Sequence, residues 1–328
     1  MQIKPILIIA GEPNSVFLEI FFKCLKKEKY KSPLILICSQ KLLRSQMNYF
    51  KFKKKIKSLD PSKLKYIKLD NNSINLIDVE YKFKKVFNKV SKKSKKYIEE
   101  LFSIGCKIIK SNYTNKLING PISKKHFLNK KFLGITEYLS TEFNAINTGM
   151  LIYNKNLSVS PLTTHLPIKK ISNSISKNLI IKKIKLINSF YKKNFSTKPK
   201  IGLLGLNPHC ETSGNFSEEE IFIKPALKVL KNLKIKVSGP LSADTAFLRQ
   251  NRKKYDVIVG MYHDQVLTPL KTLYEYDAIN ITMGLPFLRV SPDHGPNEKM
   301  VNKNLSNPTS LHKALQFLDK NWLKQKKV

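Results

Sequence analysis

Nine residues, IGLLGLNPH from Ile201 to His209, contain the pattern from which the fold follows. A short apolar run, residues 201–204, ends where Asn207-Pro208 turns the chain and presents His209. Similar apolar runs, rich in β-branched residues, recur along the chain, and longer amphipathic stretches separate them. This alternation is typical of a mostly parallel sheet covered by helices, so the sequence predicts an α/β fold.

The expected strands and helices divide the chain into two lobes. Helical spacing of apolar residues predicts helices over 97–109 and 175–190, and a closing helix from Leu311 to Trp322. A length of 328 residues fits two α/β lobes, which we place at residues 1–130 with 300–328 and at residues 131–299. The expected strands are residues 6–9, 34–37, 66–69, 117–119, 201–204, 257–259 and 279–282.

The net charge of +37 raises the question of a nucleic-acid partner. All but four of the 60 basic residues are lysines, spread over almost the whole chain, whereas phosphate and base recognition favours arginine. We therefore expect solvated lysine-rich faces and no specific nucleic-acid site, although a basic nucleic-acid-binding protein stays an alternative. The positive field would attract phosphorylated substrates and dinucleotides.

The sequence contains no apolar run of about 20 residues, so we expect no membrane span. Met1 to Ala10 lacks a signal-peptide pattern, and we expect a cytoplasmic protein. The four cysteines are far apart and form no C-x-x-C pair, which indicates buried reduced thiols rather than a disulfide framework or a zinc ribbon.

Three histidines follow the ends of expected strands. His165 stands in P-L-T-T-H-L-P, His209 in G-L-N-P-H, and His263 in V-I-V-G-M-Y-H-D-Q. In open α/β sheets ligands collect beyond the carboxyl ends of strands, so the three side chains could converge. Three imidazoles with an open position suit a catalytic divalent ion, but any one of them by itself could equally be a hydrogen-bonded structural residue. We interpret His126 and His312, in helix-like context, as surface residues.

Acidic and basic residues near these segments extend the candidate site. Asp264 follows His263 directly, and Asp244 lies in G-P-L-S-A-D-T, where it could orient a histidine, act as a general base, or cap a helix. Arg289 follows a Gly-x-Pro turn and is one of only four arginines. It could grip a phosphate or carboxylate in a bidentate fork, or form a structural salt bridge.

The sequence contains no G-x-G-x-x-G, so the Rossmann fingerprint for dinucleotides is missing. If the protein binds NAD, it does so through another arrangement.

An ordered series of motifs is spread over about residues 8–295. The motifs are G-E-P at Gly11, N-G-P-I-S-K at Asn119, T-T-H-L-P, G-L-N-P-H, G-P-L-S-A-D-T, M-Y-H-D-Q and N-I-T-M-G-L-P-F-L-R-V-S-P-D-H-G. Such a series is far more specific than any single motif. It closely resembles the 4-hydroxythreonine-4-phosphate dehydrogenase family of vitamin B6 biosynthesis.

The resemblance implies a homodimer of two-lobed α/β/α subunits, similar to isocitrate and isopropylmalate dehydrogenases, with the active site in the cleft between the lobes. It implies that histidines matching His165, His209 and His263 hold a divalent metal, zinc, magnesium or cobalt, and that both subunits contribute to the site. The catalytic candidates are Asp244, Asp264 and Lys271. The implied substrate contacts are Thr136, Lys271, Asn280 and Arg289.

The implied reaction oxidises the secondary alcohol of 4-phosphooxy-L-threonine with NAD, or with NADP, and the β-keto acid loses CO2 to give 3-amino-2-oxopropyl phosphate. A metal ion would favour deprotonation of the alcohol and stabilise the enolate that forms as CO2 leaves. Cationic side chains such as Lys271 and Arg289 would anchor the anionic ends of the substrate.

Two departures from the family pattern bear on the substrate and the cleft. Gly134-Ile135-Thr136-Glu137 replaces the usual G-H-T-E, which favours as an alternative a paralogous dehydrogenase of another phosphorylated hydroxy acid, such as a four-carbon sugar-acid phosphate. The usual G-E-P-A-G-I-G-P is replaced by residues 11–18, in which Val16 and Phe17 cannot take up positive φ as glycine does.

Overall fold

The computed structural model describes residues 3–123, 132, 134–210 and 217–320, which form an α/β protein of two compact units. Unit 1 comprises the described parts of Met1–Asn144 and Leu285–Asn321, and unit 2 comprises those of Ala145–Gly284. Residues 134–144 and 285–299, which we had assigned to the second lobe, pack within unit 1. The α/β class expected from the sequence is confirmed.

The strands of unit 1 lie in the order β3-β4-β2-β1-β5-β12, and the pairs between them are parallel. Their central members are apolar and fully buried because helices cover both faces of the sheet, as the uninterrupted run of β1 illustrates. The strands are β1 (Ile6–Ile9), β2 (Leu34–Cys38), β3 (Lys55–Ser58), β4 (Ser73–Asp78), β5 (Lys116–Asn119) and β12 (Leu288–Pro292).

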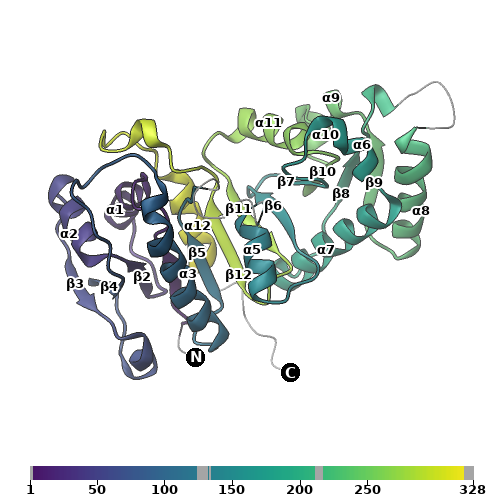
Figure 1. Ribbon diagram of the computed structural model, residues 1–328. Helices are drawn as coiled ribbons and strands as arrows, with labels where there is room; N and C mark the ends of the chain where they lie inside the picture. The colour runs from purple at the N-terminus through teal and green to yellow at the C-terminus, as the bar shows by residue number, and fades with distance from the viewer. Residues whose placement is uncertain (1–2, 124–131, 133, 211–216, 321–328) are drawn as a thin grey trace. The chain divides into compact units, whose positions relative to one another are not determined.

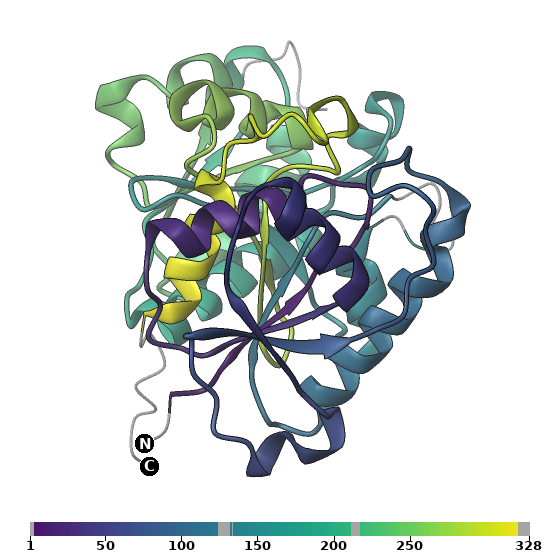
Figure 2. The same cartoon turned by 90° about the vertical axis from the view of Figure 1, so that its left-hand side faces the viewer.

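The helices of unit 1 pack on both faces of this sheet. Figure 2 shows α1 and α12 on one side of the strands and α3 on the other. Gly105 lets α3 approach β1 closely, because a Cβ at this position would lie 2.5 Å from Ile9 Cδ1. The helices are α1 (Phe17–Lys27), α2 (Gln40–Tyr49), α3 (Lys95–Lys110), α5 (Ile135–Glu142) and α12 (Thr309–Asp319).

The strands of unit 2 lie in the order β11-β6-β7-β10-β8-β9. Neighbours from β7 to β9 are parallel, whereas β6 runs antiparallel to both β7 and β11. The strands are β6 (Gly149–Tyr153), β7 (Ser158–Pro161), β8 (Ile201–Leu204), β9 (Val237–Leu241), β10 (Val257–Gly260) and β11 (Ile279–Met283).

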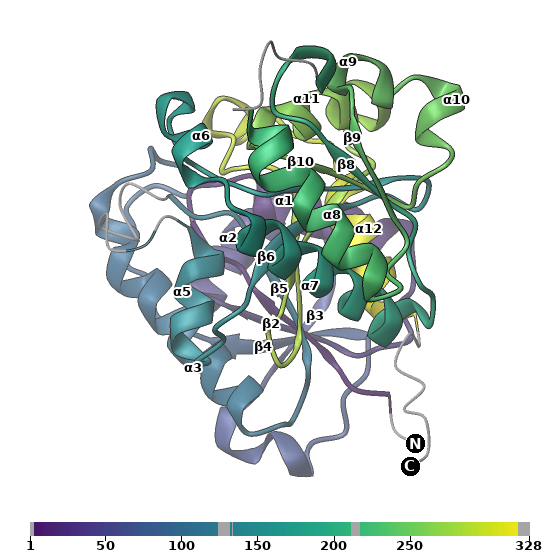
Figure 3. The same cartoon turned by 90° about the vertical axis from the view of Figure 1, so that its right-hand side faces the viewer.

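Several helices of unit 2 lie at one end of its strands. Figure 1 and Figure 3 both show α6, α9, α10 and α11 at this end. The longest helix, α7, begins where the hydroxyl of Ser176 accepts a hydrogen bond from Leu179 N. The helices are α6 (Ile171–Ser174), α7 (Lys177–Phe195), α8 (Lys224–Asn232), α9 (Ala243–Ala246), α10 (Arg249–Arg252) and α11 (His263–Tyr274).

Most of the expected strands and helices are present within one or two residues of their predicted bounds. The strand expected at 66–69 is wrong: Pro61–Tyr66 is a 3-10 helix, and the nearby strands are β3 and β4. Asp60 begins this 3-10 helix by accepting a hydrogen bond from Ser62 N, and Pro61 favours helical φ. Among the described helices, none is long and apolar enough to cross a membrane.

His312 is buried, contrary to our expectation of a surface residue, whereas His126 lies outside the described residues. His312 Nδ1 lies 3.0 Å from the Tyr30 hydroxyl, and Nε2 lies 3.3 Å from Glu28 Oε2. Burial lowers the pKa of His312, although the Glu28 carboxylate opposes this effect. These contacts connect α12 to the chain segment that follows α1.

The lowered pKa of His312 predicts a loss of stability in acid. Above its ordinary pKa of 6.5 the residue is neutral in both states; as the pH falls below this value the unfolded chain binds a proton first, which favours unfolding. In urea titrations at pH 7.5 and 5.5, the free energy of unfolding should fall more for the wild type than for His312→Gln. Equal losses in both proteins would contradict this assignment.

Candidate active site

Three neighbouring parallel strands bring the loops of the three histidines to one edge of unit 2. Strand β10 pairs with β7 on one side and with β8 on the other. His165 follows β7, His263 begins α11 just after β10, and His209 follows β8. The parallel arrangement puts all three carboxyl ends on the same edge, where the three loops lie next to one another.

Two of the imidazoles lie close enough to bind a common ion. The ring centroids of His165 and His263 are 5.9 Å apart, with an angle of 34° between the ring planes. A zinc ion lies about 2 Å from a ligating nitrogen and so about 3 Å from the ring centroid, which allows centroids up to about 6 Å apart. The separation of the two rings is thus within the upper limit for two ligands of one divalent ion.

Carboxylates face the Nδ1 atoms of two of the histidines. His263 Nδ1 lies 2.6 Å from Asp264 Oδ1, and His209 Nδ1 lies 3.7 Å from Asp244 Oδ2. A carboxylate at Nδ1 orients the ring and raises the basicity of Nε2, which is how metal-ligating histidines are commonly supported. Both side chains thus have Nε2 as their candidate ligating atom.

Asp244 lies in the first turn of α9, and Ser242 occupies the N-cap position without a side-chain capping hydrogen bond, so Asp244 is not the N-cap residue considered from the sequence. The Ser242 hydroxyl donates a hydrogen bond to Asp244, and this bond, assisted by the nearby His209, lowers the pKa of the Asp244 carboxyl. Asp244 is therefore ionised at neutral pH, which suits orientation of His209 better than uptake of a proton.

The backbone is left-handed at two of the three histidines. His165 has φ 52°, His209 has φ 55°, and Cys210 has φ 58°. Residues with a side chain adopt this region at a cost of about 1–3 kcal/mol each, so the surrounding contacts must impose it.

Glu219, which is fully buried, holds the loop that carries His209. Its Oε1 accepts hydrogen bonds from Leu206 N (2.7 Å) and Asn207 N (2.9 Å), and its Oε2 accepts one from Asn207 Nδ2 (2.8 Å). Burial acts to raise the pKa of Glu219, but these hydrogen bonds outweigh it and the pKa is lowered. The ionised carboxylate therefore fixes the turn before His209.

Within one chain, the described residues contain no group of three His, Cys, Asp or Glu side chains placed to bind one metal ion. His165 and His263 form a pair, while His209 lies beside Asp244. A complete three-histidine site would thus need a further ligand in addition to the pair.

Arg289 is buried in unit 1, where its Nε donates a hydrogen bond to Asn119 Oδ1 at 2.7 Å. Burial lowers the pKa of Arg289 to about 10, although the Glu137 carboxylate opposes this shift. The guanidinium remains charged at neutral pH. A buried cation gains most from an anion that binds close to it, as a substrate phosphate or carboxylate would.

The other predicted substrate contacts belong to both units. Thr136 lies in α5 of unit 1. Lys271 lies on α11 of unit 2, eight residues after His263 and so about 12 Å further along the helix axis. Asn280 lies in β11, and its buried Oδ1 has no hydrogen-bond partner among the described residues. This oxygen can therefore accept a hydrogen bond from a ligand.

The departures from the family motifs have local structural consequences. Val16 has φ −76° and stands at the N-cap of α1, so the helix starts without positive φ there, and positive φ in this segment is found at Gly11 (φ 78°). The Ser15 hydroxyl accepts a hydrogen bond from Phe17 N, which occupies one of the amide groups at this helix end. Ile135 is the first residue of α5 and is 8% exposed.

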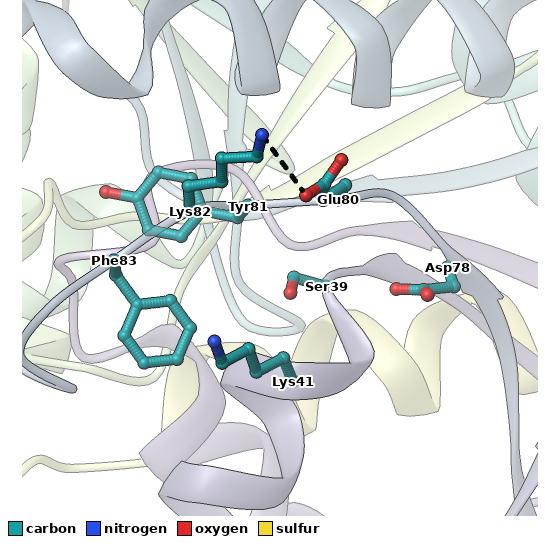
Figure 4. Close-up of a pocket in the computed structure, with 7 residues that line it drawn as sticks. All are labelled: Ser39, Lys41, Asp78, Glu80, Tyr81, Lys82 and Phe83. Carbon is teal, nitrogen blue, oxygen red and sulfur yellow. Dashed lines mark ion pairs between the residues drawn. The ribbon is translucent and has the colours of Figure 1, made fainter.

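A separate hollow in unit 1 lies at the ends of β2 and β4, between Ser39 and Phe83 (Figure 4). Its acidic and basic side chains contact one another or neighbouring groups: Lys82 lies 3.8 Å from Glu80, and Asp78 accepts a hydrogen bond from Gln40 N. Lys41 lies 5.5 Å from the centre of the Phe83 ring. With its charges balanced, this hollow carries no catalytic assignment.

Sequence reasoning gave no role to Asn119, Glu219 or Gln265, although Asn119 and Gln265 stand inside the motifs quoted above. The uncharged amides of Asn119 and Gln265 carry no distinctive chemical signal, and Glu219 lies outside the quoted motifs. Only their contacts, with Arg289 and with the histidine loops, reveal them.

The chain is similar to known proteins of the family that its motifs indicate. The chain is 38% identical to 4-hydroxythreonine-4-phosphate dehydrogenase from Sulfurihydrogenibium sp. over 322 residues, which cover 94% of this chain and 96% of that protein. It is 33% identical to D-threonate 4-phosphate dehydrogenase from Pectobacterium atrosepticum over 204 residues, 61% of this chain and 63% of that protein.

A solved structure shares the fold. The crystal structure of 4-hydroxythreonine-4-phosphate dehydrogenase from Klebsiella pneumoniae matches with a TM-score of 0.82 and 24% identity, over 96% of this chain and 98% of that one. The family model of pyridoxal phosphate biosynthetic protein PdxA matches residues 29–318. The resemblance found in the sequence motifs is thereby confirmed, and the chain belongs to the PdxA family.

Proposed function

We propose that this protein oxidises 4-phosphooxy-L-threonine with NAD and releases CO2 and 3-amino-2-oxopropyl phosphate, as a step of vitamin B6 biosynthesis. The observation that carries the proposal is the similarity to a 4-hydroxythreonine-4-phosphate dehydrogenase over 94% of the chain. The cluster of histidine loops at one sheet edge supports it, because oxidation of an unactivated alcohol benefits from a metal ion.

The proposal includes a divalent ion held by His165, His209 and His263, with zinc, magnesium and cobalt as candidates. When bound, the ion would act as a Lewis acid toward the substrate alcohol, and NAD or NADP would accept the hydride. Because only His165 and His263 form a pair within the described chain, we propose that a homodimer completes the ligand set.

The chain's own side chains would bind and orient the substrate. Arg289, held by Asn119, would grip the phosphate or the carboxylate, and Lys271 would supply a second cation. Asn280 would use its unpaired Oδ1 to accept a hydrogen bond, and Thr136 would offer a hydroxyl. Asp264 and Asp244 would hold the imidazoles of His263 and His209 in their ligating orientation.

We also propose that the protein acts in the cytoplasm, which its buried thiols support. Cys24, Cys38 and Cys106 are buried and form no disulfide among the described residues, and reduced cysteines are typical of that compartment.

A second candidate substrate is a four-carbon sugar-acid phosphate. Two observations favour it: the chain resembles a D-threonate 4-phosphate dehydrogenase over 204 residues, and Ile135 stands where the family usually has a histidine. A buried isoleucine cannot donate a hydrogen bond to a substrate, so recognition of this part of the substrate must differ.

Removal of the metal should abolish activity. EDTA is expected to stop NADH formation from 4-phosphooxy-L-threonine, and a divalent ion should restore it. His209→Ala should lower both the bound metal and kcat by about 100-fold, because residues that only orient the ligands cannot replace a lost ligand. His312→Gln serves as the control and should keep its metal; an EDTA-resistant wild type would refute the metal site.

Arg289→Lys should weaken substrate binding. Lysine keeps the charge but loses the planar fork, so KM should rise about 10-fold or more, with a smaller change in kcat. The exposed Arg44 provides the matched control, since Arg44→Lys should leave both constants unchanged. An unchanged KM in Arg289→Lys would exclude Arg289 from substrate binding.

The two candidate substrates can be separated by kcat/KM. Our proposal predicts a value for 4-phosphooxy-L-threonine at least about 10-fold above that for D-threonate 4-phosphate. Ile135→His should increase this preference if position 135 contacts the substrate. The reverse order of the two wild-type values would establish the second candidate instead.

A further inference from the structure

One chain of hydrogen bonds connects the loops that follow β7, β10 and β8. The Thr163 hydroxyl donates to Met261 O at 2.7 Å, and Met261 N donates to Gln265 Oε1, also at 2.7 Å. Gln265 Nε2 in turn donates to Gly205 O at 2.8 Å. Thr163 precedes His165 by two residues, and Gln265 follows His263 by two residues, so the connected atoms lie next to the candidate ligands.

The backbone around the Gln265 amide has little spare room. A Cβ at Gly260 would lie 2.8 Å from Gln265 Oε1 and 2.5 Å from Val266 Cγ1. A Cβ at Gly205 would lie 2.5 Å from Cys210 Sγ and 2.9 Å from Glu219 Oε1. The glycines thus allow the amide and the two loops to approach closely, and Glu219 continues the connection to Leu206 N and Asn207 N.

Only an amide side chain fits both of these bonds. Gln265 accepts a bond from the β10 loop with one atom and donates a bond to the β8 loop with the other. An ionised glutamate of the same length has no donor, and a methionine of similar volume has neither group. The need for one acceptor and one donor therefore explains why this position is a glutamine.

We propose that Gln265 is a positioning residue that holds the His263 loop and the His209 loop of its own chain in place, and thereby supports the affinity for a divalent ion of the metal site to which these histidines contribute. This inference rests on the proposed metal site. Gln265 does not contact the metal in this role; it acts through the backbone of Met261 and Gly205. Removal of such outer contacts weakens metal binding by about 10- to 100-fold in known metal sites.

The test compares full-length Gln265→Glu and Gln265→Met with the wild type. Gln250→Glu provides the matched control, because Gln250 is exposed on α10 and undergoes the same charge change. The affinity for Zn²⁺ is measured by competition with a chromophoric chelator, and the geometry by the visible absorption spectrum after Co²⁺ loading. kcat and KM are measured at saturating metal.

Both Gln265 variants should bind Zn²⁺ about 10- to 100-fold more weakly and show an altered Co²⁺ spectrum, while Gln250→Glu should match the wild type. Excess metal should restore kcat more fully in the two Gln265 variants than in His209→Ala. Wild-type affinity and spectrum in folded Gln265→Met would overturn the inference, as would an equal loss in Gln250→Glu.

Thr163→Val provides an independent test of the same hydrogen-bonded connection if a Gln265 variant fails to fold. It removes the hydroxyl bond to Met261 O but keeps the backbone bond from Thr163 N to the same atom, so a loss of affinity smaller than that of Gln265→Met is expected. Unchanged affinity in Thr163→Val together with unfolded Gln265 variants would overturn the inference. A wild type that binds no divalent ion would instead refute the proposed function itself.

Discussion

Parallel pairing of β7, β10 and β8 is the constraint on which the candidate site depends. Parallel neighbours end at a common edge, so the loops that follow three separate strands lie next to one another, although 44 and 54 positions separate their histidines in the chain. The spatial order also differs from the chain order, because β10 lies between β7 and β8. His263, the last of the three in sequence, therefore stands on the central loop.

Sheet pairing alone positions the loops only roughly, and polar contacts fix them further. Glu219 binds the amide groups before His209, and Gln265 joins that loop to the one before His263. The left-handed backbone at His165 and His209 requires such support, because each conformation is unfavourable by itself. The free energy of these contacts thus maintains a local geometry that the residues would not adopt alone.

Arg289, the candidate anion contact in unit 1, depends on burial rather than on strand order. Arg289 lies in a buried strand and donates a hydrogen bond to Asn119, so its charge is already removed from water before any substrate arrives. The lysines that dominate the composition are mostly at the surface, where water and salt weaken their attraction. A single buried arginine can accordingly matter more for recognition than the large net charge.

The sequence by itself determined the α/β class, most strands and helices, and the PdxA family, because apolar periodicity and ordered motifs are local properties of the chain. It misplaced a strand at 66–69, where Asp60 and Pro61 begin a 3-10 helix, and it put His312 at the surface, because periodicity does not show which neighbours cover a helix. The tertiary structure alone decided the spatial order of the histidine loops, the pairing of His165 with His263, and the contacts of Gln265, Glu219 and Asn119. These features depend on atoms far apart in the chain, whose distances follow from strand pairing and packing rather than from any local pattern.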